Sequence, residues 1–399
     1  MELIQGTHKA SKFEPQDFIS NMPENVVTNI MDRLPLQDAV RTSKLSRNWR
    51  LKWTMLSQLV FDMNFLNYLL VREDRHNIGS IISRLLLHIK GSITKFVLYI
   101  NYPASLEDIS HWVLFLSRKG IEDLTLRKEF RPQLKLPTHL FSCLELKHLK
   151  LVNCCFEPLT SFHGFPNLLS LELDNVQFES ERFGELCPAL ESLKVASPFR
   201  NSKVKPAEIG KHANLKTLSL FLCNLENIGS NSIFELVGFL PKLQELHLDF
   251  MSCEPTEGDA KRSPLTTFPC IKTLKLSTVD LGNRVMLSYA FEMIRSFSNL
   301  QTLEITASER VTVPTPGICF SEVDYNTTGS LQLCSVVFRD LKGSVNEVCL
   351  ITYLLTCSPV LKKLVIEFRS HLKPGEQLLF AGKLLKLQRA YPAVDIDLY

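Results

Sequence analysis

The stretch LPKLQELHLDF (Leu240–Phe250) contains the pattern that decides the fold of this chain. Its centre, LQELHL from Leu243, has apolar residues at the first, fourth and sixth positions. The last three positions alternate apolar, polar, apolar, which is the two-residue period of a β-strand with one buried face. The preceding Leu-Pro ends any helical segment before it, because proline cannot continue a helix. We therefore predict a short strand in the second half of the phrase, with both leucines facing inward.

The same phrase recurs along most of the chain, at intervals of 22 to 31 residues. Clear copies start at Leu168, Leu190, Leu215, Leu243, Ile271, Leu300 and Leu361, and looser copies start at Ile93, Ile121, Leu146, Leu331 and Tyr391. These intervals lie in or near the range of leucine-rich repeats, whose single units cannot bury their own apolar face. Stacking the units in parallel makes one continuous core. Nearly all these leucines are therefore interpreted as core residues, each contributing roughly 1.5–3 kcal/mol when fully buried.

The segments between the strands have apolar residues at helical spacing, as in NSIFELVGFL (Asn231–Leu240) and VMLSYAFEMIRSF (Val285–Phe297). They predict helices on the convex side of a curved α/β solenoid. A solenoid offers an extended concave surface to a partner, and the polar residue between the two strand leucines points outward there. The candidates for binding a partner on this surface are Glu172, Lys194, Ser219, His247, Lys275 and Glu304.

The N-terminal stretch NMPENVVTNIMDRLPLQDAVRTSKLSRNWRLKW (Asn21–Trp53) is unlike the repeats. Apolar residues at three- and four-residue spacing predict an amphipathic helix of about three turns, with Asn21 as a possible cap; they are Val26, Val27, Ile30 and Leu34. The next two segments, LQDAVRTSKL and SRNWRLKWTML, predict a second and a third short helix, the third capped by Ser46. In that third helix Trp49 and Trp53 would share one face.

Composition and charge narrow the possible partners. Of the 399 residues, 45% are apolar and 22% are charged, and the net charge is only +3, which argues against binding of nucleic acid by the chain as a whole. No stretch reaches the roughly 18 continuous apolar residues needed to span a membrane, and the N-terminus lacks a signal peptide. The 11 cysteines are odd in number and scattered, as expected for reduced thiols. We expect an intracellular protein of the nucleus or cytoplasm with no membrane partner.

The sequence contains no constellation that points to an enzyme or a cofactor. Cys154 and Cys155 have His139 and His148 nearby, but the spacing of zinc ligands is missing. In GEQLLFAGK (Gly375–Lys383) six residues separate the glycines, and Leu384 stands where a phosphate-binding loop needs Ser or Thr. We therefore expect a binding protein without metal or cofactor.

Two regions carry a resemblance to a known family. Met22-Pro23, Leu34-Pro35 and SKLSRNWR (Ser43–Arg50) resemble an F-box, with Met22 and Leu45 in place of the usual Leu and Val. The stretches Leu341–Phe368 and Ala381–Tyr399 resemble the FBD region of plant F-box/leucine-rich-repeat proteins. The resemblance implies a tail at residues 1–18, a three-helix F-box at 19–65, a leucine-rich-repeat solenoid at 66–335 and an FBD region at 336–399 that closes the solenoid.

The resemblance also implies a function. F-box proteins are substrate receptors of SCF-type cullin-RING ubiquitin ligases, in which the F-box binds the Skp adaptor and the rest of the chain holds the substrate. The residues that this assigns to the adaptor are Met22, Pro23, Val26, Ile30, Leu34, Pro35, Val40, Leu45, Trp49 and Arg50. A basic rim suited to an acidic adaptor would consist of Arg41, Lys44, Arg47, Arg50 and Lys52.

A second interpretation stays open on the sequence. Repeat arrays need end caps, so the N-terminal helices could merely cap a leucine-rich-repeat interaction scaffold that serves no ligase. The feature that separates the two is the exposure of the Leu34–Trp49 face. An exposed apolar patch of several hundred Å² marks a partner site, whereas a buried face means a cap.

Overall fold

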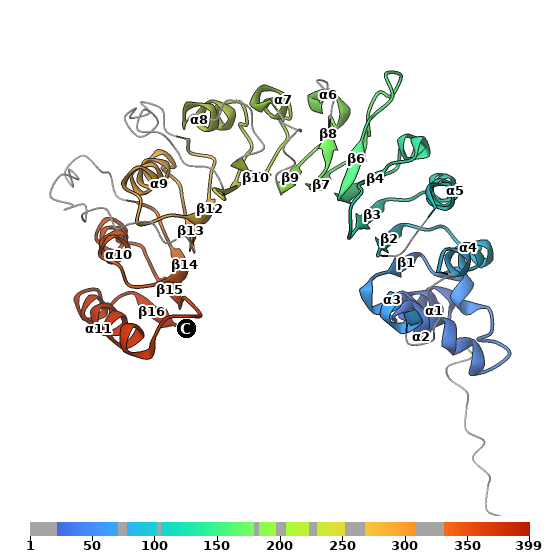
Figure 1. Cartoon of the computed structure of the whole chain (residues 1–399), viewed down its shortest axis with the longest axis horizontal. Coiled ribbons are helices and arrows are strands. Elements are labelled where there is room, and N and C mark those ends of the chain that lie inside the picture. The colour runs from blue at the N-terminus through green and yellow to red at the C-terminus, as the bar shows by residue number, and fades with distance from the viewer. Residues whose placement is uncertain are drawn as a thin grey trace, which may run out of the picture.

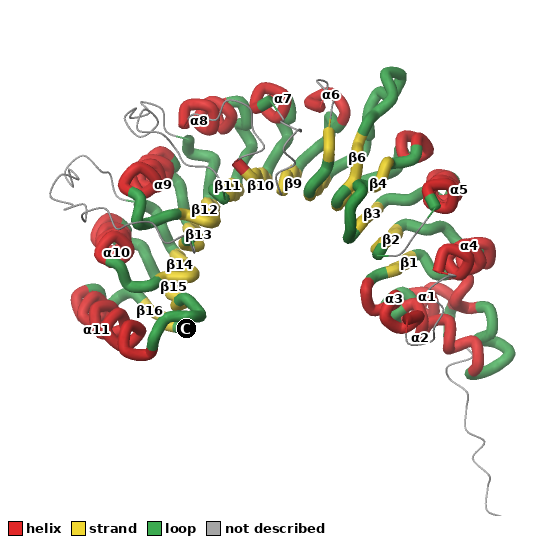
Figure 2. Tube along the Cα trace, viewed as in Figure 1, coloured by secondary structure: helices red, strands yellow, loops and turns green. Residues whose placement is uncertain are grey.

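The described chain folds into an arc of parallel strands with helices along its outer side (Figure 1). This computed structural model describes residues 22–70, 78–101, 105–178, 183–196, 205–222, 230–251, 268–308 and 331–399. The predicted tail at residues 1–18 and the predicted cap Asn21 lie outside these ranges. The tube in Figure 2 places the strands on the concave side and the helices on the convex side.

The main sheet has thirteen strands whose spatial order follows the sequence. Every neighbouring pair is parallel. The strands are β1 (Gln58–Phe61), β2 (Lys95–Ile100), β3 (Asp123–Lys128), β5 (His148–Val152), β7 (Ser170–Asp174), β9 (Ser192–Ala196), β10 (Thr217–Phe221), β11 (Glu245–Asp249), β12 (Thr273–Val279), β13 (Thr302–Ala307), β14 (Ser335–Leu341), β15 (Lys363–Phe368) and β16 (Asp395–Leu398).

The repeated phrase sets the register of this sheet. Leu218 of β10 pairs with Leu246 of β11, and Leu246 pairs with Leu274 of β12, so equivalent residues of successive phrases lie side by side. All three leucines are buried, whereas the residue between each pair of strand leucines faces out. The leucine columns thus form one apolar core between the sheet and the outer helices.

Two looser copies of the phrase were placed two residues too early. Val336 of β14 pairs with Leu303, so the phrase there begins at Leu333 and not at Leu331. Ile396 of β16 pairs with Leu364, which moves the last phrase from Tyr391 to Ala393. A shift of two residues keeps every side chain on the same face, because the strand period is two. The sequence prediction also missed β1, although LSQLVF (Leu56–Phe61) has apolar residues at the first, fourth and sixth positions and Leu59 pairs with Phe96.

The convex side holds the longer helices. The helices are α1 (Glu24–Met31), α2 (Leu36–Arg41), α3 (Met63–Leu70), α4 (Ile78–His88), α5 (Leu106–Ser117), α6 (Phe183–Leu186), α7 (Pro206–Gly210), α8 (Ser230–Gly238), α9 (Arg284–Ser296), α10 (Val345–Cys357) and α11 (Pro374–Ala390), with 3-10 helices η1 (Thr42–Lys44), η2 (Lys52–Met55) and η4 (Thr138–Ser142). The two helices expected near residues 231–240 and 285–297 are α8 and α9. None of the described helices is long and apolar enough to cross a membrane.

A second, three-stranded parallel sheet flanks the first and contains β4 (Leu134–Lys135), β6 (Cys154–Phe156) and β8 (Gln177–Phe178). The chain bends from β5 into β6 at Asn153 and towards β8 after β7 at Asn175. Both asparagines have left-handed φ values, 56° and 51°, a conformation that asparagine tolerates better than most residues. The Asn175 amide donates to Asn153 Oδ1 at 3.1 Å, so the bends of successive repeats stack.

Glu347 organises the start of α10 near the C-terminal end of the arc. Its buried carboxylate accepts hydrogen bonds from the backbone N–H groups of Lys342 at 3.1 Å, Gly343 at 2.7 Å and Ser344 at 2.9 Å. Gly343 has φ +80°, and a Cβ there would lie 2.6 Å from the Phe380 ring. The negative charge also suits the positive end of the helix dipole.

We expect Glu347→Ala to lower the free energy of unfolding by about 2–3 kcal/mol, because it leaves several N–H groups without their acceptor. Urea denaturation followed by circular dichroism measures the change. Glu376→Ala is the matched control, since Glu376 has the same helix position in α11 but is exposed. An equal loss in the two variants would contradict a special role for the buried carboxylate.

Candidate functional site

Helix α1 has apolar residues on two faces. Val27 and Met31 are buried in the core, whereas Val26 and Ile30 are 42% and 40% exposed on the other side of the helix. The sequence predicts instead that Val26, Val27, Ile30 and Leu34 share one face of a helix of about three turns. In the structure α1 has eight residues, and Leu34 lies beyond its end, exposed. The face that includes Val26 and Ile30 is therefore free for a partner.

Further apolar side chains are exposed along the chain after Pro35. Pro23 and Pro35 are both exposed, and Leu45 is among the most exposed leucines of the protein. Leu51 and Met55 are exposed as well, and the sequence analysis did not select them. The signal that could have found Leu51 is an apolar residue placed directly between two basic residues, Arg50 and Lys52. We call the exposed apolar residues Val26, Ile30, Leu34, Leu45, Leu51 and Met55 the terminal apolar surface.

Trp49 is not available to a partner, contrary to expectation. Its side chain is only 7% exposed, and it belongs to the core that the N-terminal helices share with the sheet. The predicted third helix is also wrong, because the chain forms turns around Trp49 and then η2. Trp49 and Thr54 are both buried, although five residues of helix would place them on opposite sides. Ser46 still accepts the Trp49 N–H, at 3.3 Å.

Two other predicted contact residues, Met22 and Val40, are half-buried and pack against the core. Val40 lines a cavity of about 270 Å³ between α2 and helices α3 and α4, together with Phe65 and Ile81. Val40 thus faces the first elements of the arc. Of the predicted adaptor residues, the exposed ones are Pro23, Val26, Ile30, Leu34, Pro35, Leu45 and Arg50.

The N-terminal helices are joined to the sheet by polar contacts as well as by the core. Asp32 at the end of α1 accepts both the backbone N–H of Ser57, at 2.9 Å, and its hydroxyl, at 2.6 Å. The Lys90 N–H donates to the carbonyl of Thr54 at 2.9 Å. The module therefore covers the N-terminal end of the arc, in addition to exposing an apolar surface.

The basic rim is smaller than expected. Arg41 forms an ion pair with Asp38 at 3.0 Å, and its guanidinium lies over the Tyr68 ring. Lys52 lies 3.4 Å from Glu24. Within the described residues, the rim side chains without an ion pair are Lys44, Arg47 and Arg50.

The six concave-face candidates lie in one row across the sheet. Glu172 pairs with Lys194 in strand register, and the row continues without a break to Glu304. Their equivalent places in the repeated phrase bring residues from distant parts of the chain side by side. The sequence reasoning predicted this row; its role in binding remains a prediction.

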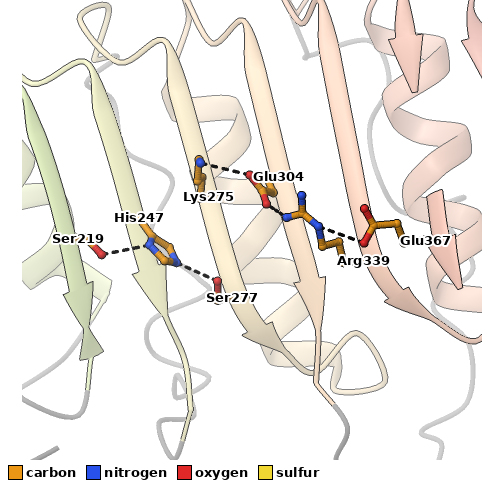
Figure 3. Close-up of polar contacts among 7 residues, drawn as sticks. All are labelled: Ser219, His247, Lys275, Ser277, Glu304, Arg339 and Glu367. Carbon is orange, nitrogen blue, oxygen red and sulfur yellow. Dashed lines mark hydrogen bonds and ion pairs between the residues drawn. The ribbon is translucent and has the colours of Figure 1, made fainter. Parts of the chain in front are cut away.

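Much of the row is engaged in internal ion pairs. Lys150 pairs with Glu172 at 2.7 Å. Farther along, Lys275 lies 3.3 Å from Glu304, and Arg339 bridges Glu304 and Glu367 (Figure 3). Alternating charges on neighbouring strands thus neutralise one another.

Between these two charged groups lies a neutral hydrogen-bonded chain. Ser219 Oγ lies 3.0 Å from His247 Nδ1, and Ser277 Oγ lies 2.8 Å from His247 Nε2 (Figure 3). Burial lowers the pKa of His247; nearby Asp249 opposes this shift, while Lys275 and Lys194 add to it. His247 is therefore neutral at pH 7. Lys194, the neighbour of Ser219 in the row, has no ion pair among the described residues.

Comparison with known proteins shows which family the chain resembles. The F-box domain model matches residues 19–60, and the model described as FBD-associated F-box protein At5g56370, LRR repeats, matches residues 109–205. An Arabidopsis thaliana F-box/FBD/LRR-repeat protein, At1g13570, is 32% identical over 385 residues, covering 88% of this chain and 91% of the relative. A putative F-box/LRR-repeat protein of the same plant, At3g42770, is 24% identical and covers 94% of this chain and 79% of that relative.

The F-box match at the N-terminus, followed by parallel leucine-rich strands, places the chain in the class of F-box proteins with leucine-rich repeats. The chain belongs to the F-box/FBD/LRR-repeat family, and the resemblance found in the sequence is confirmed. A plant origin fits these relatives. Members of the family generally recognise substrates and do not catalyse reactions, and F-box proteins typically serve SCF ligases.

Burial of Trp49 predicts that Trp49→Ala lowers the free energy of unfolding by about 3–5 kcal/mol. Ile30→Ala is the control, because Ile30 is exposed, and it should change stability by less than about 1 kcal/mol. Chemical denaturation of both variants tests this difference. A Trp49→Ala variant as stable as Ile30→Ala would show that the indole is not part of the core.

The lowered pKa of His247 predicts a pH dependence of stability. A histidine with a folded pKa below its unfolded value of about 6.5 stabilises the fold above pH 6.5, and this contribution is lost as the pH falls below that value. The thermal midpoint should therefore fall more between pH 7.5 and pH 5.5 in wild type than in His247→Gln, whose amide does not titrate. Equal falls in the two proteins would refute the prediction.

Proposed function

We propose that this protein is a substrate receptor of an SCF-type cullin-RING ubiquitin ligase in the nucleus or cytoplasm. The F-box, residues 19–65, docks on the Skp adaptor. Residues 66–335 form a leucine-rich-repeat solenoid, closed by the FBD region at 336–399, whose concave face binds a protein substrate. The ligase then acts by raising the effective concentration of substrate lysines near the charged ubiquitin-conjugating enzyme.

The observation that supports adaptor docking is the terminal apolar surface. A helix that covers the end of a repeat array needs one apolar face, but α1 has a second one at Val26 and Ile30. Exposed apolar side chains grouped in one module favour a partner that removes them from water. Lys44, Arg47 and Arg50, which lack ion pairs among the described residues, would steer an acidic adaptor towards this surface.

The runner-up function is an interaction scaffold whose N-terminal helices serve no ligase. Its support is the shared core, since Trp49 and the Asp32–Ser57 contacts fasten the module to the sheet as a cap. A cap alone, however, gives no reason for the exposure of Val26, Ile30 and Leu45. The two functions therefore differ in whether those side chains bind a protein.

For the substrate, we assign the concave row two kinds of role. Glu172, Lys275 and Glu304 are held in ion pairs and shape the surface. Lys194 is left to make a direct charged contact, because no ion pair neutralises it among the described residues, and the hydrogen-bonded Ser219 and His247 offer a neutral polar surface beside it. The substrate is read by side chains that the repeat places in register. No cofactor enters this mechanism.

Ile30→Glu tests adaptor docking, because it places a charge in the terminal apolar surface without touching the buried face of α1. We expect at least a tenfold loss of co-purification with a recombinant Skp adaptor and an unchanged melting temperature. Leu87→Glu is the matched control, since Leu87 is 81% exposed on α4, outside the F-box. Failure of the wild-type chain to bind the adaptor would leave the scaffold function.

A further inference from the structure

The last helix, α11, has apolar residues on opposite sides. Phe380, Leu384 and Leu387 face the core at four- and three-residue spacing. Leu378 lies two residues before Phe380 and Leu385 lies two residues before Leu387, each about half a turn away from the core side, and they are 75% and 51% exposed. Ordinary surface helices place charged or polar residues on that side. Leu379, beside them, is 72% exposed.

Two glycines share the outer side of α11 with these leucines. Gly375, Leu378, Gly382 and Leu385 follow one another at intervals of three, four and three residues, so they form one stripe. A Cβ added at Gly375 or at Gly382 would meet no atom within 4 Å. Packing against the described residues therefore requires neither glycine, and each leaves a hollow next to a projecting leucine.

When the stripe is reversed about Phe380, each leucine takes the place of a glycine and each glycine takes the place of a leucine. In GEQLLFAGKLL (Gly375–Leu385), Leu378 and Gly382 are equally distant from Phe380, and so are Gly375 and Leu385. If two copies of α11 crossed antiparallel near Phe380, each leucine of the stripe would face a glycine of the other copy. Small residues opposite large ones allow two helices to approach closely.

We propose that the outer side of α11 binds the same side of α11 in a second copy of this chain, forming an antiparallel two-fold dimer. A two-fold interface requires a surface that complements itself, and the stripe meets this requirement. A foreign partner would need only an apolar face and would not need the reversed order of leucine and glycine. The antiparallel arrangement also aligns the helix dipoles favourably.

The place of α11 in the arc allows this contact. Figure 1 shows α11 as the outermost helix at the C-terminal end, with α10 beside it, while α1 lies at the opposite end. Dimerisation through α11 would leave the terminal apolar surface of both copies free. The proposal goes beyond the proposed function and does not depend on it, because neither the adaptor nor the substrate takes part.

The size of the stripe predicts a weak dimer. The surface area that three leucines from each copy can bury is smaller than the roughly 1,600 Å² buried in a standard stable complex. We expect reversible association with a dissociation constant on the order of 10–100 µM.

Sedimentation velocity of the full chain, from about 1 to 200 µM, tests the proposal. The wild type should shift from monomer to dimer across this range. Gly382→Leu fills the hollow that receives Leu378 of the other copy, and we expect it to weaken association at least tenfold. It should fold normally, since no described residue occupies that space. Leu378→Ala removes the projecting side chain and should also weaken the dimer.

The double variant Leu378→Ala/Gly382→Leu exchanges the leucine and the hollow. If residue 378 faces residue 382 of the other copy, the exchange restores association towards the wild-type level, an outcome that a general loss of apolar surface does not produce. Leu87→Ala is the control for removing an exposed leucine elsewhere. A wild type that stays monomeric at 200 µM, or a dimer insensitive to Gly382→Leu, would overturn the proposal.

Discussion

The burial of leucine columns between a parallel sheet and its outer helices is the interaction on which the rest of the structure depends. The repeated phrase supplies three apolar side chains and the segment after each strand supplies others, but a single repeat cannot bury its own apolar face. Parallel pairing in register places equivalent leucines next to one another, as with Leu218, Leu246 and Leu274. The same register brings the intervening polar residues together on the concave face. Core and surface therefore follow from one pairing rule.

An array of this kind has two open ends, and each is covered by a different module. At the N-terminal end, Trp49 and the Asp32–Ser57 contacts join short helices to β1. At the C-terminal end, Glu347 fastens the start of α10, and Phe380 of α11 packs into the core. Both terminal helices also carry a second apolar face, which capping does not require. This surplus of exposed apolar surface locates the contacts that we propose with other chains.

The concave face is organised by charge pairing within the chain. The Lys275–Glu304–Arg339–Glu367 network ties four neighbouring strands together, and exposed pairs of this kind contribute little to stability. These ion pairs affect which side chains a partner can contact, because charges that are already paired are less available to it. The charged row is interrupted by the neutral Ser219–His247–Ser277 chain and by Lys194, which has no ion pair within the part of the chain that the structure describes. The centre of the concave face thus differs chemically from its flanks.

The sequence by itself determined the parallel strands, the inward leucines, the outward row from Glu172 to Glu304 and the family. A local period of two specifies which side chains share a face, and it survives the two-residue errors at β14 and β16. Tertiary structure alone decided that Trp49 is buried and that Val26 and Ile30 are exposed while Val27 and Met31 are not. Apolar residues at helical spacing predict a helix, but where the helix has two apolar faces the spacing does not show which face packs against the core. That choice depends on the neighbouring elements, which come together only when the chain folds.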